Sequence, residues 1–65
     1  MTYLPTDREL SALRAYLQYG TCKGAGGSIG ASEQAVKMIL LRFRERAKVN
    51  SIGQLIFVYH SELAA

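Results

Sequence analysis

The side chains best suited to chemistry lie in one segment, residues 30–49, with the sequence GASEQAVKMILLRFRERAKV. Basic groups bind the phosphates of nucleic acids through charge and hydrogen bonds. Apolar residues recur in the same segment at helical spacing, so it predicts either a solvated amphipathic helix or a helix that binds an acidic polymer. The segment holds five of the chain's eight basic residues: Lys37, Arg42, Arg44, Arg46 and Lys48.

The sequence offers few residues that are suited to enzymatic catalysis. The single histidine, His60, and the single cysteine, Cys22, lie far apart, which disfavours a zinc site, and no acid–base pair stands out. Asp7 and Glu9 are explained by the positive end of a helix. The stretch TCKGAGGSIG does not match a nucleotide-binding G-x-G-x-x-G loop, because Ile29 occupies the last required position. We predict no enzymatic activity, no metal and no cofactor.

The size and charge of the chain limit the number of its domains and indicate the kind of partner it binds. Its 65 residues allow one small domain, 1–65, without an internal disulfide. The net charge is +3. Residues 32–50 carry five basic and two acidic side chains, so the whole excess falls there, as expected of a nucleic-acid-binding face. The remaining charges balance: Arg8, Arg14 and Lys23 against Asp7, Glu9 and Glu62.

The longest apolar runs, MILL and LIFVY, are too short to span a bilayer. The N-terminal stretch MTYLPTDREL lacks the pattern of a signal peptide. We therefore expect a cytoplasmic protein with no membrane partner.

Three segments show helical patterns that would position the basic residues. In LPTDRELSALRAYLQYG, Thr6 and Glu9 form a capping box, and Gly20 stands where a helix ends. Ser32 caps a long helix at about 32–48, whose inner stripe is Val36, Leu40, Phe43 and Ala47.

The last segment, about 52–63, carries a helical stripe of Leu55, Ile56, Tyr59 and Leu63, with Ser51 and Gln54 as a second capping box. A strand is the competing interpretation, because LIFVY is rich in β-branched and aromatic residues. The glycine-rich stretch 21–30, taken alone, has the composition of a loop.

The outer face of the predicted helix 32–48 suits the major groove of DNA, which admits an α-helix. Gln34 can pair with adenine and Lys37 with guanine, while Met38 and Leu41 can touch thymine methyl groups. The candidate phosphate contacts, which fix register without reading sequence, are Lys23, Ser32, Arg42, Arg44, Arg46 and Lys48.

Three alternatives remain open at this point. The arginines could simply be solvated, and Met38 and Leu41 could belong to a wider core or to a protein interface. The chain could then be a small interaction module that binds a regulator or polymerase subunit. It could also bind DNA without sequence preference, as an architectural protein.

Over residues 4–63 the chain resembles the GerE-type helix-turn-helix domain that ends transcription regulators of the LuxR/NarL family. The resemblance rests on three stretches: LPTDRELSALRAYLQYG, SIGASEQAVKMILLRFRERAKV and VNSIGQLIFVYH. It includes no sensory or receiver domain. It implies a small all-α domain of four helices, a short glycine-rich second helix, and a tight turn before the recognition helix. The positions matching the family's base-reading residues are Lys37, Met38 and Leu41.

The resemblance also implies that the last helix brings two copies together. Phe57 and Val58 fall off its helical stripe, as expected of a helix with a second partner. We therefore predict a homodimer that binds double-stranded DNA and regulates transcription. The predicted dimer surface comprises Ile52, Leu55, Phe57, Val58 and Tyr59.

Overall fold

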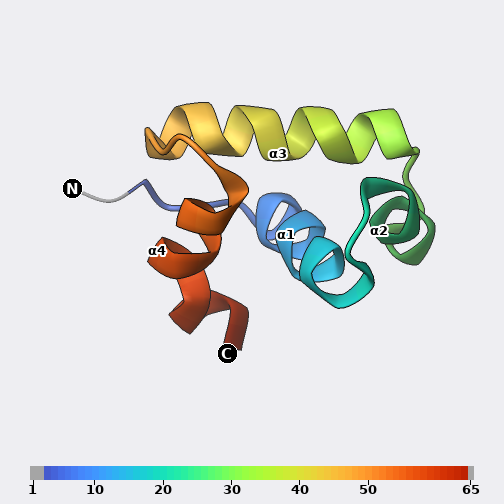
Figure 1. The fold of residues 1–65 in the computed structure, drawn as a ribbon, viewed down its shortest axis with the longest axis horizontal. Helices are drawn as coiled ribbons and strands as arrows, with labels where there is room; N and C mark the ends of the chain where they lie inside the picture. Colours follow the sequence, from blue (N-terminus) through green and yellow to red (C-terminus); the bar gives the residue numbers. More distant parts are fainter. Residues whose placement is uncertain (1–2, 65) are drawn as a thin grey trace.

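Residues 3–64, the part described by the computed structural model, form four α-helices and contain no strand. In Figure 1, α3 lies across the top and α1 passes beneath its middle, with α2 near the start of α3 and α4 near its end. α1 contacts each of the other three helices. The predicted four-helix, all-α class is therefore confirmed. The four helices are α1, Asp7–Tyr19; α2, Cys22–Ile29; α3, Glu33–Ala47; and α4, Ile52–Ala64.

Both predicted ends of α1 are present. The Thr6 hydroxyl accepts a hydrogen bond from the Glu9 backbone N–H at 3.2 Å, and the Glu9 carboxylate accepts one from the Thr6 N–H at 2.9 Å. This reciprocal pair satisfies amides that otherwise lack a partner in the first turn. Gly20 ends the helix with φ +78°, a left-handed conformation that glycine adopts at little cost.

The loop expected from the composition of residues 21–30 is wrong, because Cys22–Ile29 is a regular helix. Thr21 caps it by accepting from the Gly24 N–H at 3.0 Å, and Gly30 ends it at φ +72°. Gly26 is buried, and a Cβ placed there would lie 2.5 Å from the Ala31 carbonyl oxygen. The close contact between α2 and the next turn therefore requires glycine despite its low helix propensity.

The core is small and apolar. Its buried members from α3 are three of the four residues of the predicted stripe, while Ala47 is half-buried at its edge. The Phe43 ring contacts the rings of Tyr3 and Tyr59, with centroid separations of 6.1 and 5.1 Å. The buried apolar residues are Ala12, Leu13, Ala15, Ala25, Val36, Leu40, Phe43, Leu55 and Tyr59.

The last segment is helical, so the strand alternative is wrong. The Ser51 hydroxyl accepts from the Gln54 N–H at 3.2 Å, as the predicted capping box requires. The return bond to the Gln54 side chain comes from the Asn50 N–H at 2.6 Å and not from Ser51. At Tyr59 the backbone departs from helical geometry, with φ −109° and ψ 17°, so α4 is kinked. None of the helices within residues 3–64 is long and apolar enough to cross a membrane.

Candidate nucleic-acid interface

The outer face of α3 presents the four side chains predicted to read bases. Gln34, Lys37, Met38 and Leu41 are all exposed, whereas Leu40 between them is buried. Met38 is 38% and Leu41 42% exposed, so the alternative in which these two residues extend the core is wrong. Both residues present part of their surface to solvent, where a partner can contact it.

The basic side chains lie on both flanks of that face. At 100° per residue, Lys37 and Arg44 fall on one side of Met38, and Arg42 and Arg46 fall on the other. Lys37 also pairs with Glu33 of the same helix at 3.2 Å, but both side chains are about half exposed, so solvent screens the pair. Between these two cationic edges the face carries Gln34, Met38 and Leu41, together with one exposed acidic residue, Glu45.

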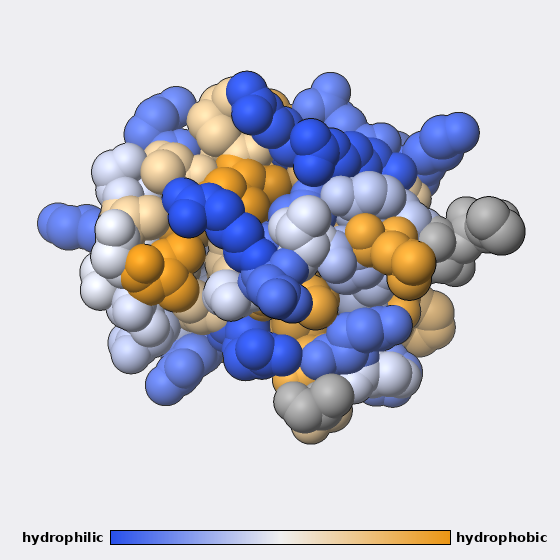
Figure 2. All heavy atoms as spheres, turned by 180° about the vertical axis from the view of Figure 1, so that it is seen from behind, coloured by the Kyte–Doolittle hydropathy of each residue, from blue (hydrophilic) through white to orange (hydrophobic). Residues whose placement is uncertain are grey.

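Figure 2 shows the molecule from behind the view of Figure 1. Hydrophilic side chains predominate along the upper edge, where α3 lies, and hydrophobic spheres form separate patches below it. On this face the exposed apolar atoms therefore do not join into one broad apolar surface.

One flank of α3 borders a hollow of about 250 Å³, lined by Lys37, Leu40, Leu41 and Arg44 of α3 and by Cys22 and Ile52. The Arg44 Nε atom is buried and has no hydrogen-bond partner within residues 3–64. Arg44 is thus held partly inside the fold, with its charged group at the edge of the predicted reading face.

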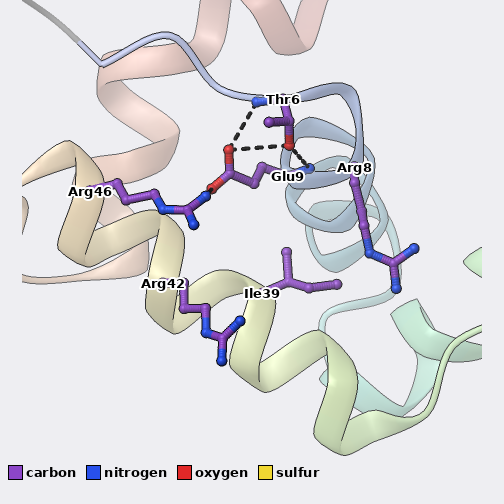
Figure 3. Close-up of a pocket in the computed structure, with 6 residues that line it drawn as sticks. All are labelled: Thr6, Arg8, Glu9, Ile39, Arg42 and Arg46. Atoms are coloured by element: carbon purple, nitrogen blue, oxygen red, sulfur yellow. Dashed lines mark hydrogen bonds and ion pairs between the residues drawn. The ribbon is translucent and has the colours of Figure 1, made fainter.

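The other flank borders a second hollow, of about 190 Å³, between α3 and the start of α1 (Figure 3). Thr6, Arg8 and Glu9 line it from the α1 side, and Ile39, Arg42 and Arg46 from α3. In Figure 3 the Arg46 side chain is turned toward Glu9, whereas Arg8 and Arg42 extend away from that carboxylate.

The Glu9 carboxylate is the most highly connected polar group in the structure. It is 5% exposed, and its Oε1 accepts hydrogen bonds from the Tyr3 hydroxyl at 2.7 Å and from the Thr6 N–H at 2.9 Å. Its Oε2 lies 3.4 Å from Nη1 of Arg46. Burial by itself raises the pKa of Glu9, but these hydrogen bonds and the Arg46 charge together lower it below the ordinary 4.5.

These contacts give Arg46 a role other than the predicted phosphate contact. Its guanidinium is held by Glu9 and by the Tyr3 hydroxyl, at 3.4 Å each, and these contacts raise its pKa. Arg46 therefore compensates a buried carboxylate of α1, whereas a phosphate contact would compete for the same group.

The remaining predicted phosphate residues are exposed but differ in setting. Lys23 lies in the first turn of α2, and the Ser32 hydroxyl caps α3 by accepting from the Ala35 N–H at 3.0 Å. Lys48 ends α3 at φ 59°, the only non-glycine residue with a positive φ among residues 3–64. A lysine in this conformation costs about 1 kcal/mol relative to glycine.

Two of the residues predicted for the dimer surface are unavailable for it. Leu55 is fully buried and Tyr59 is 1% exposed, because both pack into the chain's own core. Ile52 is half-buried against that core. Phe57 and Val58 are exposed, by 80% and 42%, and remain as candidates.

Arg8 also lines the hollow beside Arg42, although it was not among the site residues predicted from the sequence. Arg8 stands in the first turn of α1, where the helix dipole disfavours a cation. A basic residue between the two acidic residues of that turn therefore called for another explanation.

No family model, curated protein or solved structure matches the chain.

Proposed function

We propose that the protein is a sequence-specific transcription regulator that binds duplex DNA by placing α3 in the major groove. The observation that carries the proposal is the outer face of α3, where exposed Gln34, Met38 and Leu41 lie between two basic flanks. A helix with its side chains is about 10–12 Å across, and the major groove is about 12 Å wide. Basic groups on both flanks thus match the phosphates that line both edges of the groove.

The connection between α2 and α3 supports the same proposal. Only Gly30, Ala31 and Ser32 separate the two helices, which is the length of the turn in a helix-turn-helix unit. The resemblance to GerE-type domains points to the same pair of helices and to Lys37, Met38 and Leu41 as base-reading positions. The charge distribution and the turn length are the independent physical support for that resemblance.

The test is selection of binding sites from a random duplex pool at near-physiological salt. We expect enrichment of one motif. Lys37→Ala and Met38→Ala should each reduce the preference for that motif over random DNA by roughly tenfold, because a base contact contributes about 1–3 kcal/mol of discrimination. Absence of enrichment, together with weak DNA affinity, would refute the proposal in favour of a protein-interaction module.

Lys48→Gly is the matched variant for a phosphate contact. Glycine adopts the positive φ of this position freely, so the variant loses a charge without losing stability. It should weaken the selected motif and random duplexes by the same factor and reduce the slope of log affinity against log salt by about one. A change in sequence preference would contradict this division of roles.

The proposed regulator acts as a homodimer through the exposed side of α4. We expect Phe57→Ser to shift a concentration-dependent dimer toward monomer in sedimentation equilibrium, without unfolding the monomer itself, because Phe57 is 80% exposed. A dimer would favour an approximately two-fold symmetric motif with half-sites about 34–36 Å apart. A wild-type protein that stays monomeric, on and off DNA, would contradict the dimer.

A further inference from the structure

The hollow between the start of α1 and α3 combines two helices that are distant in sequence (Figure 3). Arg8 comes from the first turn of α1, and Arg42 comes from the flank of α3 that borders the predicted reading face. Both side chains are exposed. The hollow therefore continues the basic flank of α3 onto a second element of the fold.

The charges in this hollow are only partly compensated. The Glu9 carboxylate is matched by Arg46 at 3.4 Å and by hydrogen bonds from Tyr3 and Thr6. By contrast, Arg8 and Arg42 form no ion pair within residues 3–64. The hollow thus holds three guanidinium groups and one carboxylate, and the charges of Arg8 and Arg42 remain for an anion.

A phosphate group fits these features. A guanidinium presents parallel N–H donors whose spacing matches two phosphate oxygens, and two such groups can hold one phosphate from two sides. The carboxylate at the back of the hollow is nearly buried and already engaged by Arg46 and its hydrogen-bond donors, so the arginines, not Glu9, are presented to an incoming anion.

We infer that this hollow is a phosphodiester site in which Arg8 and Arg42 together hold one backbone phosphate of bound DNA. The inference rests on the proposed function and deepens it. With α3 in the major groove, the strand along this flank passes over the start of α1. Arg8 then fixes how far α3 is tilted in the groove, because it adds a contact away from the helix axis.

The test compares Arg8→Ala with Arg14→Ala. Arg14 carries the same charge on the same helix, but its guanidinium is bound to the backbone carbonyls of Glu62 and Leu63, at 3.2 and 3.3 Å. Arg8→Ala should weaken binding about tenfold for selected and random duplexes alike, and lower the salt slope by about one. Arg14→Ala should leave the slope unchanged, and thermal melts of both variants report whether each is folded.

A second measurement locates the phosphate on the DNA. Single uncharged methylphosphonate groups are introduced along the selected duplex, one position at a time. One substitution should weaken binding of Arg8→Ala less than it weakens binding of the wild type, since the variant has already lost the Arg8 contact and retains only that of Arg42.

The possible outcomes are separable. If folded Arg8→Ala binds with the wild-type affinity and salt slope, the phosphodiester site is overturned while the proposed function stands. Saturable binding of inorganic phosphate in its place, with DNA affinity insensitive to Arg8, would assign the hollow to free phosphate and overturn the inference. Wild-type protein with no DNA affinity would overturn both proposals.

Discussion

Gly26→Ala should destabilise the protein by about 3 kcal/mol, enough to leave much of the chain unfolded at 25 °C, since so small a core rarely supplies more than about 3–5 kcal/mol. The added Cβ would lie 2.5 Å from the Ala31 carbonyl oxygen and 3.1 Å from the Ser32 carbonyl. These are backbone atoms of the turn before α3, so they cannot rotate away as a side chain would. The Gly26 carbonyl also accepts the Ala31 N–H at 2.8 Å, which fixes the two segments together.

Gly27→Ala is the matched control for this change. Gly27 lies in the same helix, is exposed, and has no atom within 4 Å of an added Cβ. Alanine should therefore stabilise the protein there by up to about 1 kcal/mol through helix propensity. Urea unfolding followed by circular dichroism gives both values. Equal midpoints for the two variants would contradict the close α2–turn contact.

Glu9→Gln should lower the free energy of unfolding by about 2 kcal/mol at neutral pH. The amide keeps one acceptor, but its N–H₂ donor must face either Arg46 or the Tyr3 and Thr6 donors, so part of this buried network loses its partners. Breaking a fully buried ion pair costs about 3–5 kcal/mol, and the value here is smaller because the Arg46 side chain is about half exposed. Urea unfolding of the wild type and the variant at pH 7 measures the difference.

The difference in the free energy of unfolding between the wild type and Glu9→Gln should disappear in acid. The pKa of Glu9 is lowered in the folded state, so its contribution to the free energy of unfolding is fully present above the ordinary pKa of 4.5. It disappears as the pH falls through the lowered value. Glu33→Gln is the control, because its carboxylate is about half exposed beside Lys37 and should contribute less than about 0.5 kcal/mol. A gap between wild type and Glu9→Gln that is constant with pH would contradict the lowered pKa.

The helices that carry caps in the sequence were predictable, and α1 is the clearest case. Thr6, Glu9 and Gly20 specify its start and end through bonds between near neighbours, and such bonds depend on little else in the fold. α2 has caps of the same kind, Thr21 and Gly30, but its glycine-rich composition favoured a loop. Its glycines oppose helix formation locally, and the reason for Gly26 is a close contact with the Ala31 carbonyl, which depends on the path of the turn that leaves α2.

The candidate site was predictable only where it depends on the pattern along a single helix. Periodicity correctly separated the exposed face of α3 from its buried stripe. It could not show that Arg46 contacts Glu9 of another helix, or that Arg8 lines the same hollow as Arg42. In α4, apolar residues occur on more than one side, so periodicity did not decide which of them form the core. Leu55 and Tyr59 do, and Phe57 does not.

The Tyr59 hydroxyl donates a hydrogen bond to the Tyr3 carbonyl at 2.6 Å, joining positions 56 residues apart in the chain. Closing so long a loop costs more entropy than forming contacts between helices adjacent in sequence, such as α1 with α2 or α2 with α3. In folding, the N-terminal segment and α4 should therefore close late, after the first three helices have packed. In the native state they should open together as one local unfolding unit. The stability of the residues before α1 thus depends on α4 as much as on α1.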